Sequence, residues 1–210
     1  MSDAFIREVD EDLRQKQLKN FWKTYGKFII GIAVGIVLLV GGRSFYNYIM
    51  EAKYEKQATA YANALKSDES LIPTALDPII ASDVDGYKII ATFKKAELAI
   101  KAGDNQGAIK IFDQFIATAN VPQFYKDTAN IQAALLAIEV ETTDQIRTRL
   151  SLILNGDSGF KYLGEELVGL SELKSGEIAA AKTRLKGLTE DLEVPASVKE
   201  RAEQYLSVIE

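Results

Sequence analysis

The chain of 210 residues contains neither cysteine nor histidine. Without them it has no disulfide, no thiol nucleophile, no thiolate metal ligand and no imidazole general base, so most familiar catalytic centres are excluded and we expect no metal, no cofactor and no enzymatic activity. The net charge is −5, and residues 43–210 carry nineteen basic against twenty-five acidic side chains. An acidic domain of this kind argues against nucleic acid as a partner.

Residues 1–24 are predicted to form a short amphipathic segment in the cytoplasm. Phe5, Val9 and Leu13 recur every four residues on one face of a helix, and oppositely charged side chains four residues apart lie on the other faces. Two interpretations stay open for this segment: a solvated tail that stops transfer of the chain, or a peptide that docks on a specific partner.

A membrane-spanning helix is predicted over residues 25–46. Its centre is a run of fifteen uncharged residues, 28–42, which covers about 22 Å of a hydrocarbon core about 30 Å thick. Aromatic and basic side chains at both ends, among them Trp22, Tyr25 and Tyr46, extend the span to the headgroup level of the lipid bilayer. The alternative, a buried core helix of a soluble domain, does not account for this bracketing.

The basic residues favour an N-terminus in the cytoplasm. Five of them lie between Arg14 and Lys27 with no acidic residue among them, whereas those after the span alternate with Glu51 and Glu55. A cleaved signal peptide is disfavoured, because the N-terminal region is acidic in part and no small-residue cleavage site follows the apolar run. We therefore expect a retained single-pass anchor in the bacterial inner membrane, with the C-terminal domain in the periplasm.

Residues 47–210 are predicted to fold as an all-α domain of helical hairpins. Segments with helical periodicity follow one another without a convincing strand pattern, and turn signals separate them. The first helix ends at Ser67-Asp68, and Asp77-Pro78 is predicted to interrupt the next one. Later boundaries are marked by Asp85-Gly86, Gly103-Asp104-Asn105, Asn120-Val121-Pro122, Thr142-Thr143, Gly156-Asp157-Ser158-Gly159, Ser175-Gly176 and Val194-Pro195.

A weak repeat relates three of these hairpins. Their turn positions, Gly103, Glu141 and Gly176, are spaced 38 and 35 residues apart, close to the period of about 34 of a tetratricopeptide repeat. A generic helical bundle stays open as an alternative, because the Trp and Tyr of the repeat consensus are missing. After each turn, three apolar residues at offsets of four and three form a predicted core ladder: Ala108, Phe112 and Phe115; Ile146, Leu150 and Ile153; Ala181, Leu185 and Leu188.

Two blocks near the N-terminus carry a family resemblance. The residues 5–14 read Phe-Ile-Arg-Glu-Val-Asp-Glu-Asp-Leu-Arg, and residues 21–27 read Phe-Trp-Lys-x-Tyr-Gly-Lys ahead of a short, glycine-rich span. With the hairpins that follow, they resemble the YfgM family, proteobacterial inner-membrane proteins with a tetratricopeptide-repeat-like periplasmic domain that are ancillary subunits of the Sec translocon. The alphaproteobacterial branch is the most similar.

That resemblance implies a non-enzymatic accessory protein beside the translocation channel. The partners it implies are the Sec translocon and a membrane-anchored periplasmic chaperone of the prolyl-isomerase class. It supplies no catalytic residues.

Gly31 and Gly35 form a GxxxG motif within the span. Such a motif lets two helices approach closely in lipid, so three interpretations stay open: homo-oligomerisation, docking on a partner's membrane helix, and no role.

A peptide-binding groove is a second candidate site. In a solenoid, one face of the first helix of each hairpin lines a concave surface, although apolar residues at this spacing are ordinarily buried. The predicted groove residues are Phe93, Glu97 and Ile100; Ile131, Leu135 and Ile138; and Leu163, Leu167 and Leu170.

The sequence therefore favours a membrane-anchored protein-interaction scaffold that serves protein export. A self-associating structural tether is the first alternative. A membrane-tethered hydrolase that uses Ser/Lys or paired carboxylates is the least favoured, because no pattern in the sequence places such groups together and the chain lacks the GxSxG signature.

Overall fold

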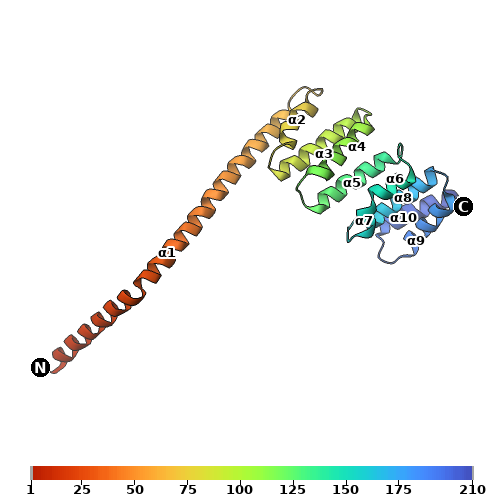
Figure 1. The fold of residues 1–210 in the computed structure, drawn as a ribbon. Coiled ribbons are helices and arrows are strands. Elements are labelled where there is room, and N and C mark those ends of the chain that lie inside the picture. Colours follow the sequence, from red (N-terminus) through yellow and green to blue (C-terminus); the bar gives the residue numbers. More distant parts are fainter. Residues whose placement is uncertain (1, 210) are drawn as a thin grey trace. The chain divides into compact units, whose positions relative to one another are not determined.

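The computed structural model describes residues 2–209, all of whose regular structure is helical (Figure 1). Side chains are described from residue 11 onward, apart from residues 12 and 29, so the predicted apolar stripe of Phe5 and Val9 lies outside them. The all-α prediction is confirmed. The helices are α1 (Ser2–Leu65), α2 (Ile72–Ile80), α3 (Asp85–Lys101), α4 (Asn105–Thr118), α5 (Gln123–Ala137), α6 (Thr143–Arg149), α7 (Ser151–Asn155), α8 (Lys161–Lys174), α9 (Ile178–Glu190) and α10 (Ala196–Ile209).

The chain divides into two compact units, residues 1–56 and residues 57–210. The first unit consists of α1 up to Lys56, and within residues 2–209 α1 alone is long and apolar enough to cross a membrane. Large apolar side chains of its central part are open to the surroundings: Phe28 is 72 % exposed and Leu39 is 76 % exposed. This helix fits a single-pass membrane anchor or a signal sequence.

The second unit is a series of helical hairpins (Figure 1). α3 packs on α2 and α4, α4 also packs on α5, α5 on α6, and α8 on α9, while α10 packs on α9 and α8. Figure 1 shows α3 and α4 running antiparallel to one another. The apolar side chains between paired helices form the core clusters of the domain.

Two of the hairpin turns have the same backbone geometry. Gly103 and Gly176 lie in the left-handed region, with φ of 78° and 80°. In the first turn the amide of Gly103 donates to the carbonyl of Ile100 and the amide of Asp104 to that of Ala99, both at 2.9 Å. The corresponding bonds after α8, from Gly176 to Leu173 and from Glu177 to Glu172, measure 3.2 and 2.8 Å. These are Schellman turns, which place glycine where a side chain would be strained.

The predicted core ladder is confirmed, because all nine of its side chains are buried at 4 % exposure or less. Counted from the first residue after each turn, Asp104, Thr142 and Glu177, the ladder residues stand at the same offsets of 4, 8 and 11. The three hairpins therefore share one register, even though the turn before Thr142 contains no glycine.

The prediction that Asp77-Pro78 interrupts a helix is wrong. α2 continues from Ile72 to Ile80 with Pro78 inside it, and the amide of Ala81 still donates to the carbonyl of Asp77 at 2.9 Å. Pro78 removes one backbone N–H donor near the end of this short helix. Leu76 and Ile79 on either side of it are buried, at 0 and 1 % exposure. Burial of the apolar face outweighs the lost hydrogen bond.

At the C-terminal end, α10 covers the last hairpin. Val198 and Ala202 of α10 form one buried cluster with Leu185 and Leu188 of α9. Arg201 of α10 also holds Glu166 of α8 through two hydrogen bonds of 2.6 Å.

Candidate functional site

The nine predicted groove residues fall into three environments. Ile131, Ile138 and Leu167 are buried within the core, and Phe93, Leu163 and Leu170 are partly buried against it. Only Glu97, Ile100 and Leu135 present a large part of their side chains to solvent: Ile100 is 37 % and Leu135 50 % exposed, and the Glu97 side chain is 46 % exposed.

Glu97 is held in place by two lysines of its own helix. Its carboxylate lies 3.0 Å from Lys94 Nζ and 2.6 Å from Lys101 Nζ. The hydrogen bonds from Lys101 and Lys94 lower the pKa of Glu97 below its ordinary value. This carboxylate is therefore already paired within α3.

Gly31 and Gly35 leave an open face on α1. A Cβ atom added at either position would meet no other atom within 4 Å. The face is free for a second helix to approach.

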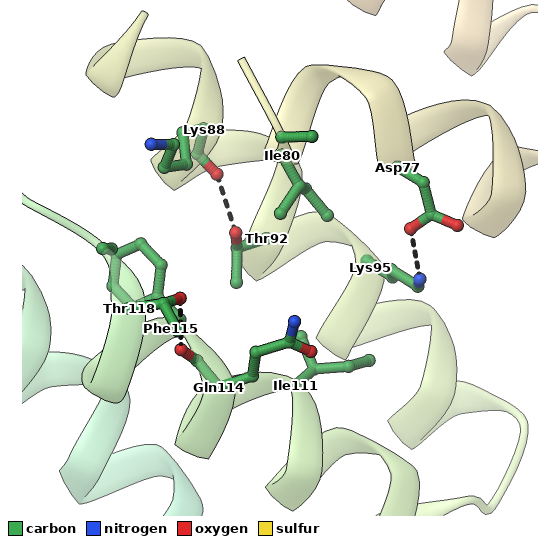
Figure 2. Close-up of a pocket in the computed structure, with 11 residues that line it drawn as sticks. Asp77, Ile80, Lys88, Thr92, Lys95, Ile111, Gln114, Phe115 and Thr118 are labelled. Atoms are coloured by element: carbon green, nitrogen blue, oxygen red, sulfur yellow. Dashed lines mark hydrogen bonds and ion pairs between the residues drawn. The ribbon is translucent and has the colours of Figure 1, made fainter. Parts of the chain in front are cut away.

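A cavity of about 450 Å³ lies between α2, α3 and α4 (Figure 2). Its volume is within the range of ligand-binding pockets. Ile80 of α2 and Ile111 and Phe115 of α4 provide the apolar part of its lining, and Lys88 and Lys95 of α3 the basic part. In Figure 2 Lys88 lies on one side of the space and the pair of Asp77 and Lys95 on the other.

The two lysines that line this cavity differ in their ion pairs. Lys95 forms an ion pair with Asp77 of α2. Lys88 Nζ lies 4.0 Å from Asp85 Oδ1, at the outer limit of an ion pair, and only 19 % of its side chain is exposed. Figure 2 shows the Gln114 carboxamide directed into the space, where it offers a donor and an acceptor.

The corresponding gap in the next hairpin, between α4, α5 and α6, has the opposite character. Three acidic side chains line it, Asp113, Glu141 and Asp144, together with Arg149. Arg149 is paired with Asp113, and its Nη2 lies 2.6 Å from Glu141 Oε1. The guanidinium is thus already neutralised by carboxylates of this chain.

The last hairpin contains a buried carboxylate that sequence reasoning missed. Glu172 of α8 has a side chain only 1 % exposed. Arg184 Nη2 and Nε bind it at 2.9 and 3.1 Å, and Arg147 Nη2 of α6 binds it at 2.8 Å. Burial alone would raise the pKa of Glu172, but the hydrogen bonds from Arg184 and then Arg147 outweigh it, so the pKa lies below its ordinary value.

These arginines extend the network beyond Glu172. Arg184 also pairs with Glu165, and Arg147 reaches Asp144 at 2.8 Å and Glu177 at 3.1 Å. No local signal pointed to this network, because its partners are separated by up to 30 residues along the chain. Each of its two arginines is paired with carboxylates of this chain, and the network joins α6, α8 and α9.

Comparison with known proteins gives one result at the level of the family. A family model, the tetratricopeptide repeat-like domain, matches residues 19–196. The chain matches no curated protein and no solved structure.

Proposed function

Because the chain belongs to the tetratricopeptide repeat-like domain family, we propose that it is a membrane-anchored scaffold that binds partner proteins in bacterial protein export. Domains of this kind suggest protein–protein interaction and are typically non-catalytic. The observation that carries the proposal is the extent of the match: residues 19–196 include both the apolar part of α1 and the hairpins of the second unit. One family model therefore covers both the apolar helix and the hairpins.

The proposed setting is the bacterial inner membrane beside the Sec translocon. The N-terminal blocks at residues 5–14 and 21–27 support it through their resemblance to the YfgM family. The same resemblance supports a membrane-anchored periplasmic chaperone of the prolyl-isomerase class as a second partner.

Two parts of the chain are proposed to share the partner contacts. The open face at Gly31 and Gly35 would pack against a helix in the membrane, and the hairpin domain would bind outside it. Each contact is weak alone, but joining both in one chain raises the effective concentration of the second once the first is made.

Capture of partners by the full-length chain tests the scaffold. The chain is extracted in mild detergent with its span intact, and retained proteins are identified by mass spectrometry. Translocon and chaperone subunits are the expected result. Recovery of further copies of this chain alone would favour the self-associating tether instead.

Replacing Gly31 and Gly35 with Leu tests the role of the span. Bulky side chains would block close helix approach, so we expect loss of most of the retained partner while the helicity of the second unit is unchanged. Replacement of Gly41 with Leu is a control, because this glycine is equally open but lies away from the face that Gly31 and Gly35 share. Equal recovery from all variants would reduce the span to an anchor.

The orientation of the chain can be tested with reporters fused after Glu210. The basic residues before the span predict an N-terminus in the cytoplasm, so a reporter active only in the periplasm should be active. Activity of a reporter that works only in the cytoplasm would contradict the proposed setting.

A further inference from the structure

The cavity between α2, α3 and α4 lies beside two positions of the first hairpin at which the last hairpin has charged side chains. In the shared register, Thr92 and Ile111 of the first hairpin correspond to Glu165 and Arg184 of the last. Glu165 and Arg184 form an ion pair, and the side chain of each is 27 % exposed. Thr92 and Ile111 carry no charge, and the Thr92 hydroxyl donates to the carbonyl of Lys88 in its own helix at 2.8 Å. The first hairpin therefore lacks an acidic side chain at the position where the last one has Glu165.

The same cavity lies on α3, a helix with a net positive charge in an acidic domain. Residues 57–210 carry sixteen basic and twenty-three acidic side chains, a net charge of −7. α3 alone carries four lysines against Asp85 and Glu97, a net charge of +2. Charge complementarity favours an anionic partner at this helix over one at the acidic helices such as α8.

The shape and lining of the cavity restrict the partner further. Ile80, Ile111 and Phe115 leave an apolar space that a hydrophobic side chain would fill. The Gln114 carboxamide can pair with a peptide group, which presents one donor and one acceptor. Lys88 can form a charge-assisted hydrogen bond with a carboxylate, which is stronger than a bond between neutral groups.

We propose that this cavity is a docking site for an extended segment of a partner protein that presents a carboxylate next to a hydrophobic side chain. Lys88 binds the carboxylate, the hydrophobic side chain packs on Ile80, Ile111 and Phe115, and Gln114 binds the peptide backbone. The carboxylate takes the place that Glu165 has in the last hairpin. This inference rests on the proposed protein-binding function and names the chemistry of one contact.

Fluorescence anisotropy with labelled hexapeptides and the full-length chain in lipid nanodiscs tests the site. One peptide, Ser-Gly-Leu-Phe-Glu-Gly with an amidated end, carries a side-chain carboxylate, and a second, Ser-Gly-Leu-Phe-Gln-Gly with a free end, carries a terminal one. The amidated form of the second peptide is neutral. A fourth, Ser-Gly-Ser-Ser-Glu-Gly with an amidated end, is charged but has no hydrophobic side chain.

We expect at least one of the two carboxylate peptides with Leu-Phe to bind about tenfold or more tightly than the neutral peptide, and also than the charged peptide without Leu-Phe. Whichever of the two binds more tightly identifies the source of the carboxylate. Equal binding of all four peptides, or none, would overturn the proposal. Binding of dodecanoate at this site without any peptide would replace the protein segment by a lipid and overturn it as well.

Variants of the chain locate the contact. Lys88→Gln should remove the preference for carboxylate, whereas Lys94→Gln, the same change on the same helix but outside the cavity, should keep it. A closing variant, Thr92→Glu with Ile111→Arg, should rebuild the ion pair of the last hairpin and abolish peptide binding. An equal effect of Lys88→Gln and Lys94→Gln would show that general charge and not the cavity selects the peptide. Circular dichroism of each variant verifies folding, and Lys88→Gln decides the result if the closing variant does not fold.

The capture experiment separates this inference from the proposed function. If the wild-type chain retains export proteins but shows no carboxylate preference, the docking site is wrong and the scaffold stands. If peptides bind as expected and no export protein is retained, the site stands and its proposed setting is wrong.

Discussion

The first and last hairpins of the second unit have the same turn and the same register but fill their interiors differently. Between α3 and α4, Phe93 lies edge-on to Phe112 and Phe115, with ring centroids 5.4 and 6.0 Å apart. Between α8 and α9, the residue in register with Phe93 is the buried Glu166, and Glu172, a second buried carboxylate, lies closer to the turn with its arginine partners. A Schellman turn and a ladder at fixed offsets therefore define the hairpin, while the remaining contacts can be aromatic or ionic.

The difference has consequences for stability and for function. Aromatic pairs gain free energy from burial over a wide range of pH, whereas a buried ion pair depends on both groups staying charged. The ionic hairpin closes its own surface gap through Arg184 and Glu165, and the aromatic hairpin leaves a cavity. The following predictions use the fragment 57–210, which forms its own compact unit.

Truncating the equivalent ladder residues should give the largest effects. Phe112→Ala and Leu185→Ala each leave a cavity and should lower the free energy of unfolding by about 2 to 5 kcal/mol, with Phe112 the more costly because its ring contacts with Phe93 are also lost. Urea unfolding followed by circular dichroism measures both. Leu192→Ala, at a side chain 94 % exposed, is the control and should be close to wild type. Wild-type stability of both truncated variants would show that the register is wrong.

Neutralising the buried carboxylate should distinguish the two hairpins. Glu172→Gln leaves Arg147 and Arg184 without their shared partner and should cost about 2 kcal/mol, measured by the same urea titration. The matched control is Glu190→Gln, since Glu190 pairs with Lys186 at 3.6 Å on the exposed surface of α9 and should contribute less than about 0.5 kcal/mol. If Glu172→Gln and Glu190→Gln lowered the free energy of unfolding equally, burial of Glu172 would add nothing to the strength of its ion pairs.

Acid should weaken the ionic hairpin selectively. The pKa of Glu172 is lower in the folded chain than the ordinary value of 4.5, so its stabilisation is complete above about pH 4.5 and is lost as the pH falls through the folded value. The difference in stability between wild type and Glu172→Gln should therefore be constant from about pH 7 to pH 5 and shrink below about pH 4.5. A difference independent of pH down to pH 3 would contradict the assignment.

The shared turns should respond alike. Gly103→Ala and Gly176→Ala each place a Cβ in the left-handed region and should cost about 1 kcal/mol in the same urea titration. Gly86→Ala, where a Cβ has open space and φ is ordinary, is the control. Unequal costs would show that the two turns, like the interiors of the two hairpins, differ.

The sequence predicted those parts of the fold that local patterns encode. Gly103 and Gly176 marked turns because only glycine adopts their φ without strain, and the apolar ladder located the middle hairpin although Glu141 gave no turn signal. Pro78 was misjudged because its effect depends on burial of the neighbouring Leu76 and Ile79, which is a tertiary property.

The candidate sites were harder to predict. A helical apolar stripe does not tell which residue faces the core, so Ile131 and Leu135, four residues apart on α5, could not be separated into buried and exposed. The apolar lining of the cavity beside α3 includes Ile111, where the other two hairpins have Arg149 and Arg184, and this difference becomes evident only when the three hairpins are aligned in their structural register.

The position of α10 over the last hairpin has a consequence for assembly. A row of stacked hairpins has two ends, and each end exposes an apolar surface onto which another hairpin could stack. α10 covers the surface formed by Leu185 and Leu188, and Arg201 of α10 donates two hydrogen bonds to Glu166 of α8. That end of the row is therefore terminated, and copies of the chain cannot join through it into an open filament unless α10 is displaced.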